Sequence, residues 1–116
     1  MRLEQALSQA AGFMEDSFAV LPLSCSRAYA QYIFVVAREG KYTVCNVSGS
    51  TTTSSIMCRE LVRMYTKAGS QWGLTWQELE EHIPESIRSD QWLLFDLDAF
   101  VSWHNRRVAA CTTSTQ

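Results

Sequence analysis

The stretch AYAQYIFVVAREGKYTVCNVS, residues 28–48, constrains the fold of this chain most strongly. It is rich in the β-branched and aromatic residues that favour strands, and Gly40 stands in the EGK turn between its two halves. The stretch therefore predicts an antiparallel hairpin over about 30–48. Residues 33–37 are apolar without alternation, which is typical of a strand covered on both faces.

Helical patterns flank this hairpin on both sides. Apolar residues recur at helical spacing, and the predicted helices cover 2–16, 55–68, 75–83 and 97–109. Thr75 and Glu78 fit a capping box at the start of the third helix, and Asp96 or Asp98 is suited to cap the last one. The run WLLF (92–95) predicts a short buried strand between them.

These elements predict an α+β fold, in which a small antiparallel sheet is packed by an N-terminal helix and by two to three C-terminal helices. The chain length of 116 residues indicates a single globular domain over 1–116. The small hydroxyl-bearing residues of 48–54 predict a flexible loop, and 111–116 predicts a loose tail. The hydroxyl-rich loop lacks the glycine and lysine pattern of phosphate-binding loops, which excludes that reading.

Composition narrows the classes of function. The net charge of −2 lacks the basic excess of a dedicated nucleic-acid binder. The chain has neither a signal-peptide pattern nor an apolar run of about 20 residues that could span a membrane. No CxxC pair is present, so we expect no zinc or other metal site, and we expect no cofactor. Because the signal-peptide and membrane-span patterns are missing, we expect reduced thiols in a cytoplasmic protein. The four cysteines are Cys25, Cys45, Cys58 and Cys111.

The segment DQWLLFDLDAFVSWHNRR, residues 90–107, combines a core pattern with two tryptophans. We expect its aliphatic and phenylalanine side chains to close the core, with Leu93, Phe95, Phe100 and Val101 as the buried set. Trp92 and Trp103 are the residues of this segment that we expect to reach a surface, because tryptophan is enriched at binding hot spots.

Acidic residues dominate the neighbouring region 78–98, which contains seven acids against Arg88 alone. Interleaved with aromatic and aliphatic residues, they indicate an apolar contact patch with a charged rim. We therefore expect a non-enzymatic interaction or regulatory factor that binds a basic surface of a partner protein. The size of the chain suits an accessory protein from a bacterium or phage. The predicted contact residues are Glu80, Glu81, Glu85, Asp90, Trp92 and Trp103.

The two histidines, His82 and His104, are the basis of a third candidate function, that of a small enzyme with a histidine-centred site. His82 lies among acids that could raise its pKa, and His104 falls on the inner side of the last helix. An enzyme would need one of them beside a cysteine or carboxylate in a concave pocket. No GxSxG elbow or comparable signature is present, so we predict no catalytic residues.

The stretch LTWQELEEHI followed by QWLLFDLDAFVSWHNRR resembles the opening helix and the closing strand and helix of excisionase-like winged-helix domains. That family reads DNA with an intervening recognition helix, whereas here only PESIRSD occupies the interval. The resemblance covers about a third of the chain and implies the leading alternative function, a DNA-binding regulator. Its phosphate contacts would come from Arg59, Arg63, Lys67, Arg106 and Arg107.

The order of predicted elements is similar to that of class I type III secretion chaperones. Both have a leading helix, a small antiparallel sheet, later helices and an acidic balance. Members of that family are dimers that hold segments of other proteins, so this similarity implies an interaction function. A homodimer would also suit a chain with four tryptophans.

Overall fold

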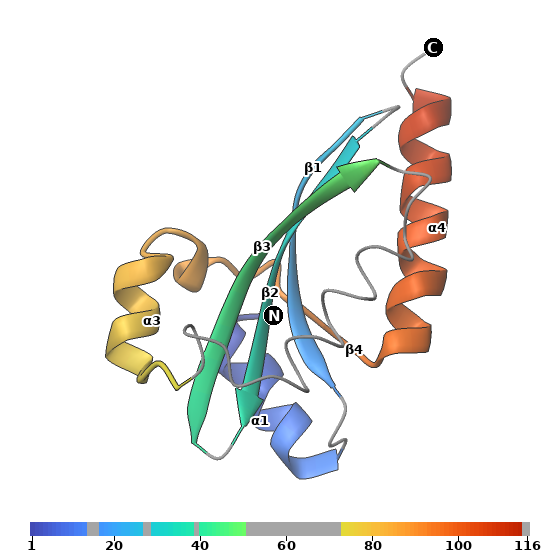
Figure 1. Cartoon of the computed structure of the whole chain (residues 1–116). Helices are drawn as coiled ribbons and strands as arrows, with labels where there is room; N and C mark the ends of the chain where they lie inside the picture. Colours follow the sequence, from blue (N-terminus) through green and yellow to red (C-terminus); the bar gives the residue numbers. More distant parts are fainter. Residues whose placement is uncertain (14–16, 27–28, 39, 51–72, 115–116) are drawn as a thin grey trace.

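The computed structural model describes residues 1–13, 17–26, 29–38, 40–50 and 73–114. It shows helices packed on an antiparallel sheet, which confirms the predicted α+β class (Figure 1). In chain order the elements are α1 (Leu3–Phe13), β1 (Phe18–Cys25), β2 (Tyr29–Arg38), β3 (Lys41–Ser50), α3 (Trp76–His82), the 3₁₀ helix η1 (Ser86–Arg88), β4 (Leu93–Phe95) and α4 (Leu97–Ser114). The predicted helix over 55–68 lies outside the described residues.

The predicted hairpin is confirmed as β2 and β3. Arg38 pairs with Lys41, and Gly40 between them has a φ of 76°, in the left-handed region that favours glycine. The strand order is β3-β2-β1-β4, and β1 runs antiparallel to both β2 and β4. β2 and β1 therefore lie inside the sheet, with β3 and β4 outside them.

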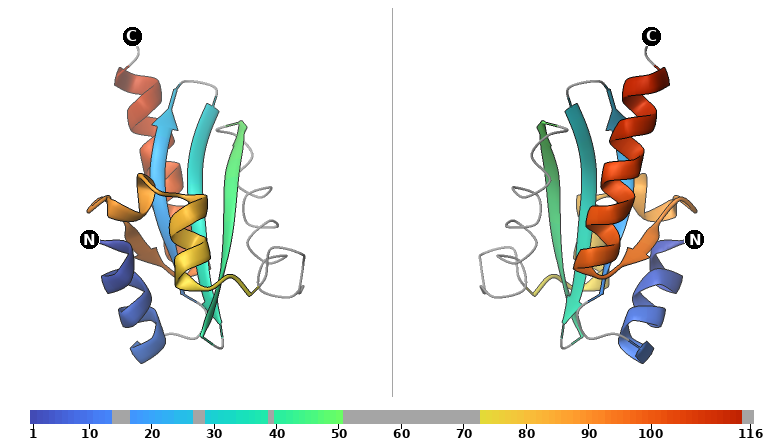
Figure 2. Two further views of the ribbon diagram at one scale, coloured as in Figure 1. Left: turned by 90° about the vertical axis from the view of Figure 1, so that its left-hand side faces the viewer. Right: turned by 90° about the vertical axis from the view of Figure 1, so that its right-hand side faces the viewer.

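Both faces of β2 are covered, as its unbroken apolar run predicts. α1 and α3 pack against one face of the sheet, and α4 runs along the other (Figures 1 and 2). The first face carries the α1–α3 core, which contains Leu3, Ala6, Leu7, Ala19, Leu21, Ile33, Val35, Val44, Leu79, Ile83, Ile87 and Trp92. The second carries the α4 core, which contains Phe18, Val20, Ala30, Tyr32, Phe34, Val36 and Phe100.

Side-chain caps begin both C-terminal helices. At α3 the Glu78 backbone NH donates to Thr75 Oγ1 at 3.1 Å and the Thr75 NH donates to Glu78 Oε1 at 3.0 Å, which confirms the predicted capping box. Hydrogen bonding to the Glu78 carboxylate, first by the Thr75 backbone NH and then by the Thr75 side chain, lowers the pKa of Glu78. At α4 the Ala99 NH donates to Asp96 Oδ1 at 2.8 Å, so Asp96 is the capping acid.

The short strand predicted in 92–95 is confirmed as β4. It pairs with the first residues of β1, from Phe18 opposite Phe95 to Val20 opposite Leu93. Phe100, from the expected buried set, is fully buried. The other three members are half-buried: Leu93 and Phe95 because β4 lies at the edge of the sheet, and Val101 on α4.

Two predicted boundaries differ from the structure. α4 continues to Ser114, into the predicted loose tail, because its last turns still contact the sheet through Arg107 and Cys111. β3 continues to Ser50, into the predicted loop, because backbone pairing with β2 requires no apolar side chain. α4 has 18 residues, and no helix among the described residues is long and apolar enough to cross a membrane.

Replacing Phe100 with alanine should destabilise the protein strongly. Its ring lies 5.3 to 5.8 Å from those of Phe18, Tyr32, Phe34 and His104, and it has no exposed surface. The cavity should lower the free energy of unfolding by about 3–5 kcal/mol in urea titrations. Ser102→Ala, on the exposed side of the same helix, is the control and should change it by less than about 0.5 kcal/mol. Equal effects of the two substitutions would contradict this packing.

Candidate functional site

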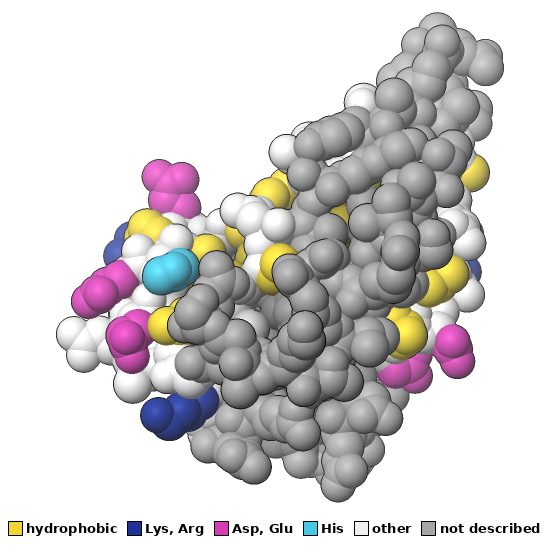
Figure 3. Space-filling view, viewed as in Figure 1, with side chains coloured by type: hydrophobic (Ala, Val, Ile, Leu, Met, Phe, Trp, Pro, Cys, Tyr) yellow, Lys and Arg dark blue, Asp and Glu magenta, His cyan; other side chains and the backbone are white. Residues whose placement is uncertain are grey.

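The four predicted acidic contact residues are all exposed, on one side of the molecule. Glu80 and Glu81 lie on α3, Glu85 directly precedes η1, and Asp90 follows it. Figure 3 shows acidic side chains gathered around the α3 end of the molecule. Their carboxylates are therefore available to a partner that approaches α3.

A small pocket of about 180 Å³ opens beside these acids, between the start of α1 and the segment from α3 to η1. Its apolar lining comes from Trp76, Pro84 and Ile87. Its charged lining consists of Arg2, Glu4, Glu80 and Arg88. Small-molecule sites usually measure roughly 300–1,000 Å³, so this pocket suits a single inserted side chain better than a whole ligand.

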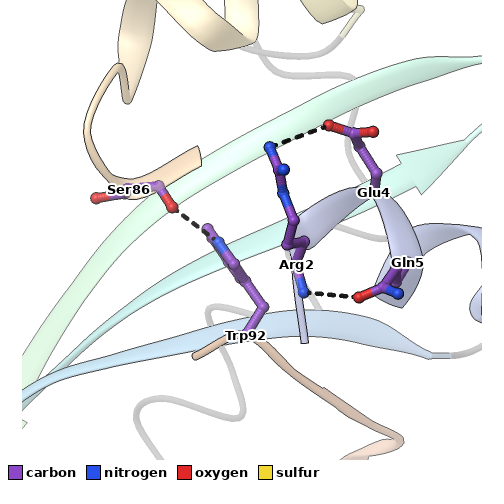
Figure 4. A network of polar contacts seen from close by, with 5 residues as sticks. All are labelled: Arg2, Glu4, Gln5, Ser86 and Trp92. Atoms are coloured by element: carbon purple, nitrogen blue, oxygen red, sulfur yellow. Dashed lines mark hydrogen bonds and ion pairs between the residues drawn. The ribbon is translucent and has the colours of Figure 1, made fainter. Parts of the chain in front are cut away.

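Two features of the pocket govern how it could bind. Arg2 and Glu4 approach within 3.8 Å, but their side chains are 56% and 63% exposed, so this ion pair is weak and can open for a partner (Figure 4). Trp76 is half-buried and its ring meets that of Tyr42 edge to face at 5.4 Å, which holds it in place. The pocket therefore combines a fixed aromatic side chain with adjustable charges.

Trp92 corrects one of the predicted contacts. It has no exposed surface, and its indole Nε1 donates to the Ser86 carbonyl at 2.9 Å (Figure 4). Its backbone NH donates to the Met1 carbonyl at 2.9 Å. The hydrogen bond to Ser86 satisfies the indole NH, so that burying it costs little. Burial of the large apolar surface of the ring then stabilises its position in the α1–α3 core. Trp92 thus holds η1 against the start of α1, and it positions the pocket without facing a partner.

Trp103, the other predicted tryptophan contact, lies on α4, across the sheet from the acidic residues. It is half-buried, and its ring packs 5.1 Å from that of Phe95. The structure therefore does not bring Trp103 together with Glu80 and its neighbours. Trp76 is absent from the predicted contact residues, although it is one of the aromatic residues interleaved with the acids; the structure gives it a half-buried place in the pocket lining.

The predicted nucleic-acid contacts are only partly described. Arg59, Arg63 and Lys67 lie outside the described residues. Arg106 is exposed, whereas the Arg107 guanidinium lies 5.0 Å from the Tyr32 ring and 5.6 Å from the Trp103 ring and donates to the Leu23 carbonyl at 3.3 Å. Arg107 is therefore engaged in holding α4 to the sheet.

The described C-terminal half also departs from a winged-helix arrangement. The interval in which that family carries its recognition helix holds only the three-residue η1. β4 pairs with β1 in the four-stranded sheet. The Trp92 contacts with Ser86 and Met1 tie this interval to α1.

The two histidines occupy different environments. His82 is exposed at the end of α3, and its charge helps to lower the pKa of Glu78. His104 has no exposed surface, and its Nδ1 lies 2.6 Å from the Tyr32 hydroxyl. Neither histidine lines the pocket beside α3.

A buried polar group joins Tyr32, His104 and Arg107. The Tyr32 hydroxyl and His104 Nδ1 share a hydrogen bond of 2.6 Å, and the Arg107 guanidinium lies over the Tyr32 ring, 5.0 Å from its centroid. Burial, and to a lesser degree the charge of Arg107, lowers the pKa of His104. Burial also raises the pKa of Tyr32, against the opposing effect of Arg107. His104 is therefore neutral at neutral pH.

Neither a metal site among the described residues nor a similarity to a known protein helps to assign the function. In the described ranges no three or more His, Cys, Asp or Glu side chains are grouped so that they could hold a metal ion. Comparisons with protein-family models, curated proteins and solved structures give no match. The function is therefore inferred from the residues of this chain alone.

The stability of the protein should fall as the pH drops below 6.5, the ordinary pKa of histidine. His104 is neutral in the native state and takes up its proton only on unfolding, so acid favours the unfolded chain. This group alone contributes a slope of up to about 1.4 kcal/mol per pH unit, between pH 6.5 and its lowered native pKa. Urea titrations at a series of pH values would measure it.

The substitution His104→Gln should flatten this pH dependence, because it removes the titrating group. His82→Gln is the matched control, because it removes an exposed histidine and leaves the buried His104 in place. An unchanged slope in the His104→Gln variant would show that other groups cause the pH dependence.

Proposed function

We propose that this protein is a non-enzymatic interaction or regulatory factor that binds a basic surface of a partner protein. The binding region is the α3 surface, which we define as Trp76, Glu80, Glu81, Pro84, Glu85, Ile87 and Asp90. One observation carries the proposal: a pocket with a half-buried tryptophan opens directly beside exposed carboxylates.

The chemistry of this surface favours a cationic side chain in the pocket. A lysine or arginine of the partner would lie over the face of Trp76, where the ring attracts a cation. Glu4 and Glu80 line the same pocket and would pair with its charge. Arg2 and Arg88 also line it, so the entering cation has to displace them toward solvent, which their exposure permits.

The surrounding acids would act mainly on recognition and rate. Glu81, Glu85 and Asp90 are exposed and lie outside the pocket lining. Exposed charges of one sign attract an oppositely charged partner over a distance and disfavour wrong partners, while each adds little affinity. The pocket then supplies the desolvated apolar centre that holds the complex together.

Several finer features belong to the same proposal. We also propose a cytoplasmic location, and a bacterial or phage source in view of the small size of the chain. A homodimer remains compatible with the four tryptophans.

The DNA-binding alternative stays a prediction, because three of its five basic residues lie outside the described residues.

Reversing two of the acids should weaken partner binding without unfolding the protein. We expect Glu80→Lys with Glu81→Lys to lower partner affinity about tenfold or more, because attraction becomes repulsion at the rim of the pocket. The thermal midpoint should change by only about 2 °C, since both side chains are exposed on α3. Tagged chains in lysate of the source organism, with nuclease present, would recover the partner for measurement by mass spectrometry and titration.

Asp98→Lys is the matched control, because this exposed acid lies on α4, across the sheet. It should leave partner recovery unchanged. Recovery that disappears on nuclease treatment would contradict the proposal and support the DNA-binding alternative. A large fall in the midpoint of the Glu80 and Glu81 variant would instead assign these acids to the fold.

A further inference from the structure

Two cysteines that are distant in the sequence meet at one end of the α4 layer. Cys25 ends β1 and Cys111 lies near the end of α4. Both are half-buried thiols, and their side chains lie close enough together for Cys111 to raise the pKa of Cys25. Figures 1 and 2 show the last turns of α4 beside the end of β1.

Packed elements on both sides hold this contact in place. Cys25 packs against the α4 core together with Trp103. Arg107, one helical turn before Cys111, donates to the carbonyl of Leu23, two residues before Cys25, at 3.3 Å. The approach of the two thiols therefore follows from the docking of α4 onto β1.

We propose that Cys25 and Cys111 are a reversible oxidation site, at which a low-molecular-weight disulfide such as oxidised glutathione converts the two thiols into a disulfide that ties α4 to β1. This inference is independent of the proposed function, because the α3 surface lies on the other side of the sheet (Figure 1). Its role would be to lock the position of the C-terminal helix when the surroundings become oxidising.

The reaction balances as two thiol–disulfide exchanges. One protein thiolate attacks a sulfur of oxidised glutathione, which forms a mixed disulfide and releases one glutathione thiolate. The second protein thiol loses its proton and attacks the protein sulfur of that mixed disulfide, which releases the second glutathione. Two protein thiols are oxidised, one glutathione disulfide is reduced, and the two protons pass to the released thiolates.

The surroundings of Cys25 control the rate of this thiol–disulfide exchange. Burial first, and then the hydrogen bond with Cys111, raises the pKa of Cys25 to about 11, while the charge of Arg107 acts in the opposite direction. Cys25 is therefore protonated at neutral pH, and the pair stays reduced until oxidant is abundant. Once formed, the disulfide benefits from a native state that already holds both sulfurs together.

A tryptic map under non-reducing conditions tests the proposal on the full chain. The two cysteines fall on separate peptides, 3–27 and 108–116, whereas Cys45 and Cys58 share the peptide 42–59. After incubation with oxidised glutathione, we expect 3–27 linked to 108–116, with a mass about 2 Da below the sum of the two thiol peptides. The thermal midpoint of the oxidised protein should rise by roughly 10 °C and return on reduction.

Matched variants complete the test. Cys45→Ser should retain the linked peptide, whereas Cys25→Ser should lose it and leave glutathione bound at Cys111. Persistent glutathione mixed disulfides in the wild-type chain, or a link from either peptide to 42–59, would overturn the proposal. A fall in the midpoint on oxidation would also overturn it, because the disulfide would then distort the docked helix.

Discussion

Burial of β2 from both sides is the constraint on which the rest of the structure depends. Its backbone is hydrogen-bonded to β1 and β3, and its side chains enter two separate cores. A strand with apolar residues on both faces cannot leave either face in water without losing the favourable burial that drives folding. Helices α1 and α3 on one side, and α4 on the other, are the consequence.

The two cores differ in character. Aliphatic residues dominate the α1–α3 core, whereas aromatic rings make up most of the α4 core and include Tyr32. Beside those rings, His104 and Arg107 add directional polar contacts. Apolar packing alone tolerates small shifts of a helix along a sheet, but a hydrogen bond of 2.6 Å between Tyr32 and His104 does not. The polar group therefore selects one position of α4 along β1 and β2.

Local patterns predicted the elements well, because they depend on neighbours in the sequence. The hairpin around Gly40 and the capping box at Thr75 needed only a few adjacent residues to be recognised. The exposure of Glu80, Glu81, Glu85 and Asp90 was also predictable, since acids are rarely buried unpaired.

The rest of the candidate site depends on tertiary contacts that no local pattern encodes. Trp92 lies among acids and suggests a surface residue, yet Ser86 and Met1 supply the partners that allow its burial. The pocket beside Trp76 exists because α1 brings Arg2 and Glu4 next to α3, and these residues are far apart in the sequence. The α4 boundary likewise follows from contacts with β1.

The shortest strand has a mechanical consequence for the whole molecule. Between α3 and α4 the chain passes from one layer to the other through β4. Successive residues of a strand point to opposite faces, so Leu94 packs into the α1–α3 core and Phe95 into the α4 core. A single peptide bond thus joins the two layers, and a displacement of α4 along the sheet would pull on the same strand that follows η1. The edge strand β4 is therefore a covalent route by which strain on one face of the sheet reaches the other.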